Sequence, residues 1–227
     1  MASIADLLPV LIGYLVGSIP FGFIIVKLKT GQDIRDQHSG RTGGTNAMRA
    51  GGFWVGLLTA LMDIGKGILA VYISRQFAPD APIVHALSAV AGIVGHNYSI
   101  FLAKRDADGK IRLGGGAGGA AALGGAAGLW WPSGIIIFIA GVLVFYFVGY
   151  ASATTLSVAT LAFIIFLIRA IQGTSPWEYL WFAVLAQVLL VWALRPNIKR
   201  LMEGTERLHG YRARKQKNAG DSGSTPN

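Results

Sequence analysis

Apolar segments about twenty residues long recur along most of this 227-residue sequence. Each is long enough to cross a bilayer as a helix, because a helix rises about 1.5 Å per residue and the hydrocarbon core is about 30 Å thick. Hydrophobic residues make up 53% of the chain and charged residues 14%, which is typical of a membrane protein. The sequence therefore predicts an all-α integral membrane protein with seven transmembrane helices. The expected spans are residues 7–26, 53–74, 82–103, 114–131, 134–150, 151–170 and 177–194.

Positively charged residues are distributed unevenly between these spans. Lys and Arg number five in residues 27–52, four in residues 104–113 and eight from residue 195 onward. Because cytoplasmic loops of membrane proteins are enriched in Lys and Arg, we expect the N-terminus outside and the C-terminus in the cytoplasm. This distribution explains the net charge of +9 without nucleic acid as a partner.

The domain organisation follows from the same pattern. Residues 1–210 are expected to form one seven-span membrane domain, and the first span is expected to be retained because it lacks a signal-peptide cleavage pattern. Residues 211–227 are basic and then rich in small polar residues, which is typical of a disordered cytoplasmic tail. The chain contains no cysteine, which excludes a disulfide framework and a cysteine-rich zinc site, and no metal is expected.

A glycine-rich polar stretch follows the first apolar segment, at residues 39–51. Its glycines allow a tight turn and bring backbone N–H groups close to a ligand, while hydroxyl, amide and guanidinium groups supply donors for phosphate oxygens. The spacing is not the P-loop pattern, so a solvated loop with incidental basic residues is the alternative. The polar and basic side chains that suit an anion are Ser39, Thr45, Asn46 and Arg49.

Several polar groups also interrupt the expected spans. Asp63 and Lys66 are three residues apart, so on a helix they share a face and can form an ion pair. Charges at membrane depth mark a functional cavity by default, and a structural ion pair inside the bundle is the alternative. His96 is either a proton carrier or hydrogen-bond donor at the membrane edge, or a packed interfacial residue. Pro20 predicts a kink in the first span, because proline leaves a backbone carbonyl unpaired.

Two later segments extend the polar side. The glycine run at residues 114–119 permits close helix packing or a close approach of backbone N–H groups to a phosphate. The charge run before it, at residues 104–112, is most simply a solvated turn. Beyond the last span, Asn197, Arg200 and Glu206 either close the same cytoplasmic site or belong to an amphipathic helix that rests on anionic lipid.

Five separated motifs, taken in order, resemble the bacterial acyl-phosphate-dependent glycerol-3-phosphate acyltransferases, the PlsY type. Together they extend over nearly the whole chain. The motifs are G-S-I-P-F-G in the first span, S-G-x-x-G-x-T-N-x-x-R from Ser39 to Arg49, D-x-x-K-G from Asp63 to Gly67, G-H-x-x-x-x-F from Gly95 to Phe101, and N-I-x-R-L-x-x-G-T-E from Asn197 to Glu206.

The resemblance implies transfer of a fatty acyl group from acyl phosphate to the 1-hydroxyl of glycerol-3-phosphate, giving lysophosphatidic acid and phosphate. It implies a multi-pass enzyme of the cell membrane, with its active site at the cytoplasmic face, with membrane lipid around it and with no cofactor. It implies Ser39, Arg49 and Asn197 as catalytic residues. The residues expected to bind substrate or phosphate are Gly40, Arg41, Gly43, Thr45, Asn46, Lys66, His96, Lys110, Arg112, Gly116, Gly118 and Glu206.

The chain departs from the family pattern at four positions. Family members usually carry G-G-K-G-x-A-T in the second motif, where the best alignment places Ala117 at the lysine and Ala121 at the threonine. They also tend to carry a histidine three residues before the asparagine of the third motif, where this chain has Leu194. Arg41 occupies a position usually held by asparagine and is a candidate to return one positive charge.

These departures keep a second function open. Lys110 or Arg112 is a further candidate to replace the missing lysine. The alternative is a protein of the same fold that binds or transports phosphorylated lipid or small phosphates, motivated by the charges inside the second span and the kinked first helix. Transport is favoured by inverted repeats, and the sequence shows no convincing internal repeat.

Overall fold

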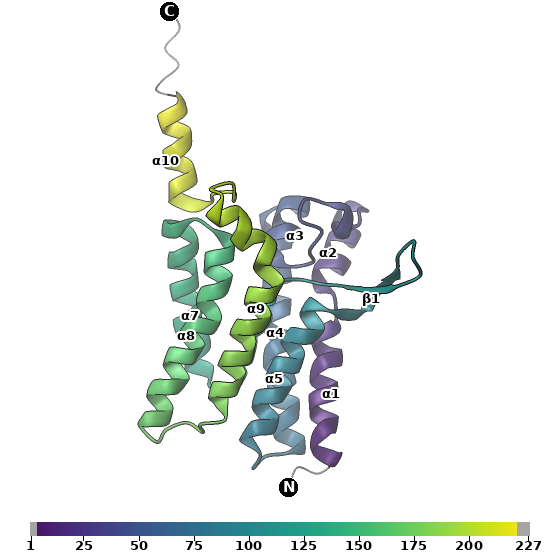
Figure 1. Ribbon diagram of the computed structural model, residues 1–227, viewed down its shortest axis with the longest axis vertical. Coiled ribbons are helices and arrows are strands. Elements are labelled where there is room, and N and C mark those ends of the chain that lie inside the picture. The colour runs from purple at the N-terminus through teal and green to yellow at the C-terminus, as the bar shows by residue number, and fades with distance from the viewer. Residues whose placement is uncertain (1–3, 222–227) are drawn as a thin grey trace, which may run out of the picture.

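The computed structural model describes residues 4–221, which form an upright bundle of helices with a hairpin projecting from one side (Figure 1). Helix α1 begins at one end of the bundle, and α10 extends from the opposite end (Figure 1). The elements are α1 (Ile4–Ser18), α2 (Phe21–Thr30), the 3₁₀ turn η1 (Ile34–Asp36), α3 (Gly44–Gly51), α4 (Phe53–Phe77), α5 (Pro82–Asn97), β1 (Ser99–Arg105), β2 (Ile111–Gly114), α6 (Gly119–Leu129), α7 (Trp131–Leu143), the π-helical turn η2 (Val144–Val148), α8 (Ala151–Ile171), α9 (Tyr179–Met202) and α10 (Gly210–Asp221).

Five helical segments of the described chain are long and apolar enough to span a membrane. Their outer faces expose large apolar side chains such as Leu11, Ile135 and Trp181, as contact with lipid requires. The fold is therefore that of a mostly helical, multi-pass integral membrane protein. The expected boundary between the fifth and sixth spans is confirmed, because Gly149 adopts a left-handed conformation between η2 and α8. The five segments are Leu7–Thr30, Phe53–Phe77, Trp131–Val148, Ala151–Ile171 and Tyr179–Met202.

Two of the seven expected spans are shorter than the sequence suggested. Helix α5 ends at Asn97, so the expectation of a helix through residue 103 is wrong. Helix α6 covers only Gly119–Leu129, and the glycine run that precedes it is not helical. Glycine loses more backbone entropy in a helix than alanine does, and Gly118 takes a left-handed φ of 89° that starts the helix late.

The intervening residues form an antiparallel hairpin of β1 and β2, so the protein is mostly helical and not all-α as expected. Its turn is closed by the carboxylate of Asp106, whose Oδ1 accepts hydrogen bonds from the backbone N–H groups of Asp108 and Lys110. Exposed Arg112 pairs with the same carboxylate at 2.7 Å. The charge run is thus a solvated turn, as the simpler interpretation had it, carried on a hairpin that projects sideways (Figure 1).

The predicted kink at Pro20 is a complete break between α1 and α2. Proline has no N–H to donate, and carbonyl groups at the end of α1 must find other donors inside the bundle. The hydroxyl of Ser99 donates to the carbonyl of Ser18 at 2.5 Å, and Nζ of Lys66 donates to the carbonyl of Ile19 at 2.9 Å. Both donors come from other elements, so the break is stabilised by tertiary contacts.

Small residues allow the helices to pack with their backbones almost touching. A Cβ atom at Gly124 of α6 would overlap the carbonyl oxygen of Ile64 on α4, and one at Gly17 of α1 would overlap the backbone of Gly92 on α5. Helix association in membranes depends on such close approach, since lipid gives no hydrophobic drive to bring helices together. The alanine and glycine content of α6 is therefore a packing feature.

We expect Gly124→Ala to destabilise the folded protein by about 1–3 kcal/mol, because the added methyl group must push α6 away from α4. The matched control is Gly65→Ala on α4, where the new Cβ has nothing within 4 Å and should be tolerated. Tryptophan fluorescence during thermal unfolding in detergent measures both. Equal unfolding temperatures for the two variants would contradict the close contact.

The largest core cluster lies between α5, α6, α8 and α9, where Phe166 and Phe182 pack edge to face at the centre. At the other end of the chain, helix α10 covers Gly210–Asp221, where the sequence predicts a disordered tail from residue 211 onward. Residues 222–227 of the expected tail lie outside the described residues. Helix α10 points away from the bundle (Figure 1).

Candidate functional site

A cavity of about 480 Å³ lies between α3, α4, α6, α7, α8 and α9. Its lining brings together segments that are far apart in the sequence, including the glycine-rich stretch and the segment after α9. Most of the expected site residues are among those that line it. They are Ser39, Arg41, Gly43, Thr45, Asn46, Arg49, His96, Gly118, Asn197 and Glu206.

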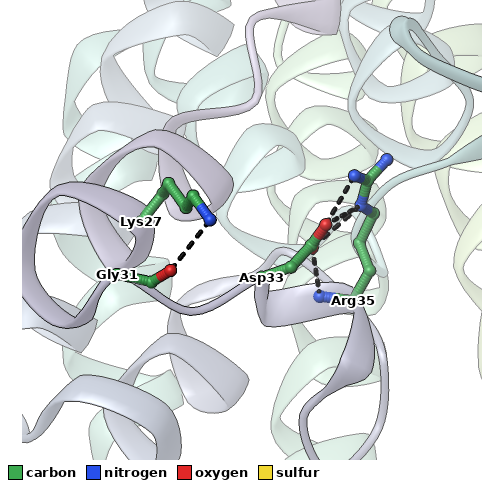
Figure 2. A network of polar contacts seen from close by, with 4 residues as sticks. All are labelled: Lys27, Gly31, Asp33 and Arg35. Carbon is green, nitrogen blue, oxygen red and sulfur yellow. Dashed lines mark hydrogen bonds and ion pairs between the residues drawn. The ribbon is translucent and has the colours of Figure 1, made fainter.

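The loop that leads into the cavity is anchored at its start by short-range polar contacts (Figure 2). Nζ of Lys27 donates to the carbonyl of Gly31 at 2.8 Å, which closes the end of α2. Asp33 accepts from the backbone N–H and the guanidinium of Arg35, and this interaction lowers the pKa of Asp33 to about 2. Arg35 also lies over the ring of Phe23 at 4.9 Å. These basic residues hold the loop and do not line the cavity.

Asn46 holds the turn of the glycine-rich stretch together. Its buried Nδ2 donates to the carbonyl groups of Arg41 at 2.8 Å, Gln37 at 3.1 Å and Ile34 at 3.3 Å. Its Oδ1 accepts from the backbone N–H of Ser39 at 3.4 Å. The side chain lines the cavity, yet its donors are already used, so its expected phosphate contact is not supported by this geometry. Gly40, with a φ of 68°, makes the turn and does not line the cavity.

Helix α3 carries Arg49 on its last turn, facing the cavity. One guanidinium nitrogen, Nη2, lies 3.1 Å from Nε2 of His209. Burial and the charges of Arg207 and Arg200 lower the pKa of Arg49, although a guanidinium stays charged at neutral pH. The α3 turn therefore presents a fixed positive charge to the cavity.

Arg41 connects the same loop to α9. Its Nη2 donates to the carbonyl of Ala193, three residues before Pro196, which lies inside α9. Helix α9 is bent toward the end that leads to α10 (Figure 1). Proline cannot donate to the carbonyl of Trp192, and Nε of Arg195 takes that role at 3.0 Å. Burial and the charge of Arg200 lower the pKa of Arg41. Arg41 thus adds positive charge to the cavity wall while it holds the loop against α9.

The segment after α9 closes the cavity from another side. Glu206 is largely buried and accepts from the hydroxyl of Ser152 at 2.5 Å and from Nδ2 of Asn197 at 3.3 Å. Arg200 and Arg207 also line the cavity. Of the two interpretations of this segment, closure of the polar site agrees with the geometry. The arginines outnumber the carboxylates on the cavity wall, so the site favours an anionic ligand.

Helix α6 begins at the cavity, which is lined by Ala117, Gly118, Gly119 and Ala120. The first amides of a helix have no intrahelical acceptor, and the helix dipole adds partial positive charge there. Gly118 cannot be replaced easily, since its φ of 89° is combined with close contact to Asn97 and Ile93. This start of a helix suits a phosphate or a developing oxyanion.

The charged residues of the second span form a buried cluster next to the cavity. Asp63 Oδ1 lies 2.9 Å from Nζ of Lys66 and 3.4 Å from Nδ1 of His96. Asp63 and His96 line the cavity, whereas Lys66 is directed to Asp63 and the carbonyl of Ile19. Lys66 therefore supports the break in the first span, and its expected phosphate contact is not supported by the geometry. Gly116 packs against the imidazole of His96.

The structure also shows which residues sequence reasoning misplaced or missed. Lys110 and Arg112 lie on the projecting hairpin and do not line the cavity, so the geometry does not support them as replacements for the family lysine. Ser152 and Thr155 line the cavity and were not anticipated. Their spacing of three at the polar start of an apolar helix is a signal that the sequence did carry. Arg207 had no comparable signal, because the tail contains many basic residues.

Fold and cavity together define a multi-pass membrane protein with a cationic site for an anionic ligand. A family model described as glycerol-3-phosphate acyltransferase matches residues 7–204. The chain is 35% identical to glycerol-3-phosphate acyltransferase 2 of Moorella thermoacetica over 207 residues, which cover 91% of this chain and 99% of the relative. It is also 35% identical to the glycerol-3-phosphate acyltransferase of Thermus thermophilus, with 89% and 94% covered.

Solved structures give the same answer. The fold is similar to the crystal structure of PlsY, an integral membrane glycerol 3-phosphate acyltransferase, in its glycerol 3-phosphate form, with a TM-score of 0.77 and 31% identity over 90% of this chain and 96% of that one. The lysophosphatidic acid form gives a TM-score of 0.75 and 30% identity, with 90% and 95% covered. This chain belongs to the glycerol-3-phosphate acyltransferase family.

Proposed function

We propose that this protein transfers a fatty acyl group from acyl phosphate to the 1-hydroxyl of glycerol-3-phosphate, giving lysophosphatidic acid and inorganic phosphate. The observation that carries the proposal is the cavity itself, whose cationic wall adjoins an apolar cleft. Both substrates carry a phosphate, and the family to which the chain belongs acts on glycerol-3-phosphate. A phospholipid precursor made in this way stays in the membrane that surrounds the protein.

The cationic wall supports binding of the two phosphates. Arg49, Arg200 and Arg207 approach the cavity from α3, from α9 and from the segment after it. Ser39 and Thr45 add hydroxyl donors on the same wall. Guanidinium groups form forked hydrogen bonds with phosphate oxygens, so this wall is the proposed site of glycerol-3-phosphate.

An apolar cleft of about 280 Å³ continues from the cavity and supports binding of the acyl chain. Both spaces share Phe138, Val142 and Phe145 in their linings, so the cleft opens directly next to the polar wall. Ile64 of α4 and Leu123 of α6 form the far side of the cleft. An acyl phosphate whose headgroup is held in the cavity can thus extend its hydrocarbon chain between helices.

The proposed reaction needs no covalent intermediate on the protein, because acyl phosphate is already activated. The hydroxyl oxygen of glycerol-3-phosphate attacks the acyl carbonyl carbon, the bond between that carbon and the phosphate oxygen breaks, and the leaving phosphate takes up the hydroxyl proton. Amides at the start of α6 stabilise the oxyanion that forms at the carbonyl oxygen. Placing both substrates in one cavity supplies proximity.

We further propose that α5 and α6 cross the membrane with the five longer segments, giving seven crossings and a cytoplasmic active site. The two ends of the described chain lie at opposite ends of the bundle, which fits an odd number of crossings (Figure 1). The cavity lies at the end that carries most Lys and Arg residues, which is the end expected in the cytoplasm.

The decisive experiment measures lysophosphatidic acid and phosphate from the purified, lipid-reconstituted chain with acyl phosphate and glycerol-3-phosphate. Equal amounts of the two products, with little product from acyl-coenzyme A, are expected. Faster turnover with acyl-coenzyme A would show that the donor is wrong. No product from either donor would favour a protein that binds or transports phosphorylated compounds.

Ala117 offers a direct test of the missing family lysine. The residue lines the cavity directly before the start of α6, so Ala117→Lys would add a cation where phosphate is proposed to bind. We expect inorganic phosphate to inhibit this variant about tenfold more strongly than wild type, as a charge-assisted hydrogen bond provides. Ala117→Met is the control, having similar length and no charge. Equal inhibition constants for the two variants would contradict the expectation.

A further inference from the structure

His209 contacts the guanidinium of Arg49 from the segment after α9. We propose that His209 is a positioning residue, which holds the guanidinium of Arg49 in the direction that binds the phosphate of glycerol-3-phosphate. The inference rests on the proposed function, because it takes Arg49 to be a phosphate ligand. The match to the family model ends at residue 204, five residues before His209.

Two contacts hold the imidazole ring, and a third holds its backbone. Its Nε2 lies 3.1 Å from Nη2 of Arg49, and its ring stacks on Phe145 with centroids 5.1 Å apart and planes inclined by 29°. The backbone N–H of His209 donates to the carbonyl of Gly149 at 2.8 Å. Gly210 follows with a φ of 60° and packs closely against the backbone of Tyr146. The ring therefore has a defined place beside the cavity wall.

The contact requires a neutral histidine. Arginine has only donors, so Nε2 of His209 must be the acceptor and the ring proton must be on Nδ1. Burial is the main cause that lowers the pKa of His209, and the charges of Arg49 and Arg207 lower it further, while Glu206 acts in the opposite direction. The ring is therefore neutral at neutral pH and able to accept.

The neighbouring elements do not reverse this balance. Arg212 is the first charged residue along α10, and its guanidinium lies over the ring of Tyr150. Tyr146 on η2 contacts the same segment through its backbone. The charged groups around the ring are thus mainly positive, which keeps the imidazole unprotonated.

His209 contacts Nη2 of Arg49, and the side chain of Arg49 also lines the cavity. Within the described residues, Nε of Arg49 is buried without a hydrogen-bond partner. A side chain already fixed by one contact loses less conformational entropy when it binds phosphate, so the contact raises affinity by preorganisation. Protonation of His209 removes the acceptor and places a second positive charge beside Arg49, so the advantage is lost as the pH falls through the lowered pKa.

Equilibrium binding of radiolabelled glycerol-3-phosphate to the full chain in lipid nanodiscs tests this, from pH 5.5 to pH 8. At the upper pH, His209→Ala should weaken binding about tenfold, the typical value of a hydrogen bond with one charged partner. His209→Gln should bind within about twofold of wild type, because its amide oxygen takes the place of Nε2. Tyr211→Phe on the same exposed segment is the control.

Two further comparisons separate positioning from a general structural effect. In an Arg49→Ala background, His209→Ala should add no further loss, because the two residues act through one contact. Since the glutamine does not titrate, the ratio of wild-type to His209→Gln affinity should fall at acid pH. Unchanged binding by His209→Ala, an additive double variant, or parallel pH profiles for wild type and His209→Gln would each overturn the proposal.

The proposed function can fail separately. If the wild type binds glycerol-3-phosphate through the Arg49 and His209 contact and yet forms no lysophosphatidic acid, the reaction is wrong and this inference stands. If His209→Ala proves unfolded by thermal denaturation, the pH profiles of wild type and His209→Gln decide the matter. Absence of any glycerol-3-phosphate binding by well-folded wild type would overturn both proposals.

Discussion

Replacing Arg49 by alanine is expected to lower kcat/KM for glycerol-3-phosphate by at least about a hundredfold, the typical loss when a fixed donor to a reacting or charged group is removed. The residue lines the cavity on the last turn of α3, and one guanidinium nitrogen is held by His209. Its loss removes a charge and leaves the phosphate that we propose to bind there with fewer donors. Initial rates of lysophosphatidic acid formation across glycerol-3-phosphate concentrations measure the effect.

Arg49→Lys refines the prediction. Lysine keeps the charge and loses the planar fork, so we expect much of the activity to be lost with folding intact. Arg105→Ala, an exposed residue of the hairpin, is the control and should leave turnover unchanged. Normal turnover in Arg49→Ala protein of unaltered unfolding temperature would remove Arg49 from the site.

The length of the apolar segments predicted the long helices correctly, but it did not predict the short helix α6 or the hairpin after α5. Apolar length identifies α4, α8 and α9, because each must satisfy its own backbone within a membrane. Helix α6 is only 11 residues long, and it is stabilised by the packing of its small residues against α4. The hairpin after α5 was missed since its apolar strand extends an apolar helix without interruption, and composition does not distinguish a strand from a helix there.

The sequence predicted several residues of the cavity lining from their type, but it did not predict the hydrogen bonds that each of them makes. Ser39, Arg49 and Glu206 stand in polar segments that composition marks, and the structure brings them to one cavity. The use of each side chain depends on three-dimensional neighbours. Asn46 Nδ2 donates to carbonyl groups of its own loop, and Lys66 Nζ donates to a carbonyl at the break in the first span. These hydrogen bonds could not be predicted from the sequence, because they depend on how the folded chain brings the donors and acceptors together.

The second large effect is expected from Asp63→Asn, which should destabilise the fold by about 3–5 kcal/mol. Both side chains of the Asp63 and Lys66 pair are at most 3% exposed, and the pair spans 2.9 Å. Removing the carboxylate charge leaves Lys66 positive and buried, with two neutral oxygens as partners, the carbonyl of Ile19 and the new side-chain amide oxygen at position 63. Unfolding in mixed detergent micelles, followed by tryptophan fluorescence, gives the change in free energy.

The matched comparison separates this buried charge from ordinary ion pairs. Lys199 and Glu203 form an exposed pair at 3.8 Å at the end of α9, and Lys199→Met should cost little, because solvent screens such pairs. Removing both buried charges in Asp63→Leu with Lys66→Met should recover much of the loss, since no uncompensated charge remains. A residual cost is still expected, because the Ile19 carbonyl at the break before Pro20 loses its donor. Equal stability of Asp63→Asn and Lys199→Met would show that the pair is not buried as the structure has it. If the double variant is no more stable than Asp63→Asn, the contact of Lys66 with the Ile19 carbonyl contributes more to stability than the charge of Asp63 does.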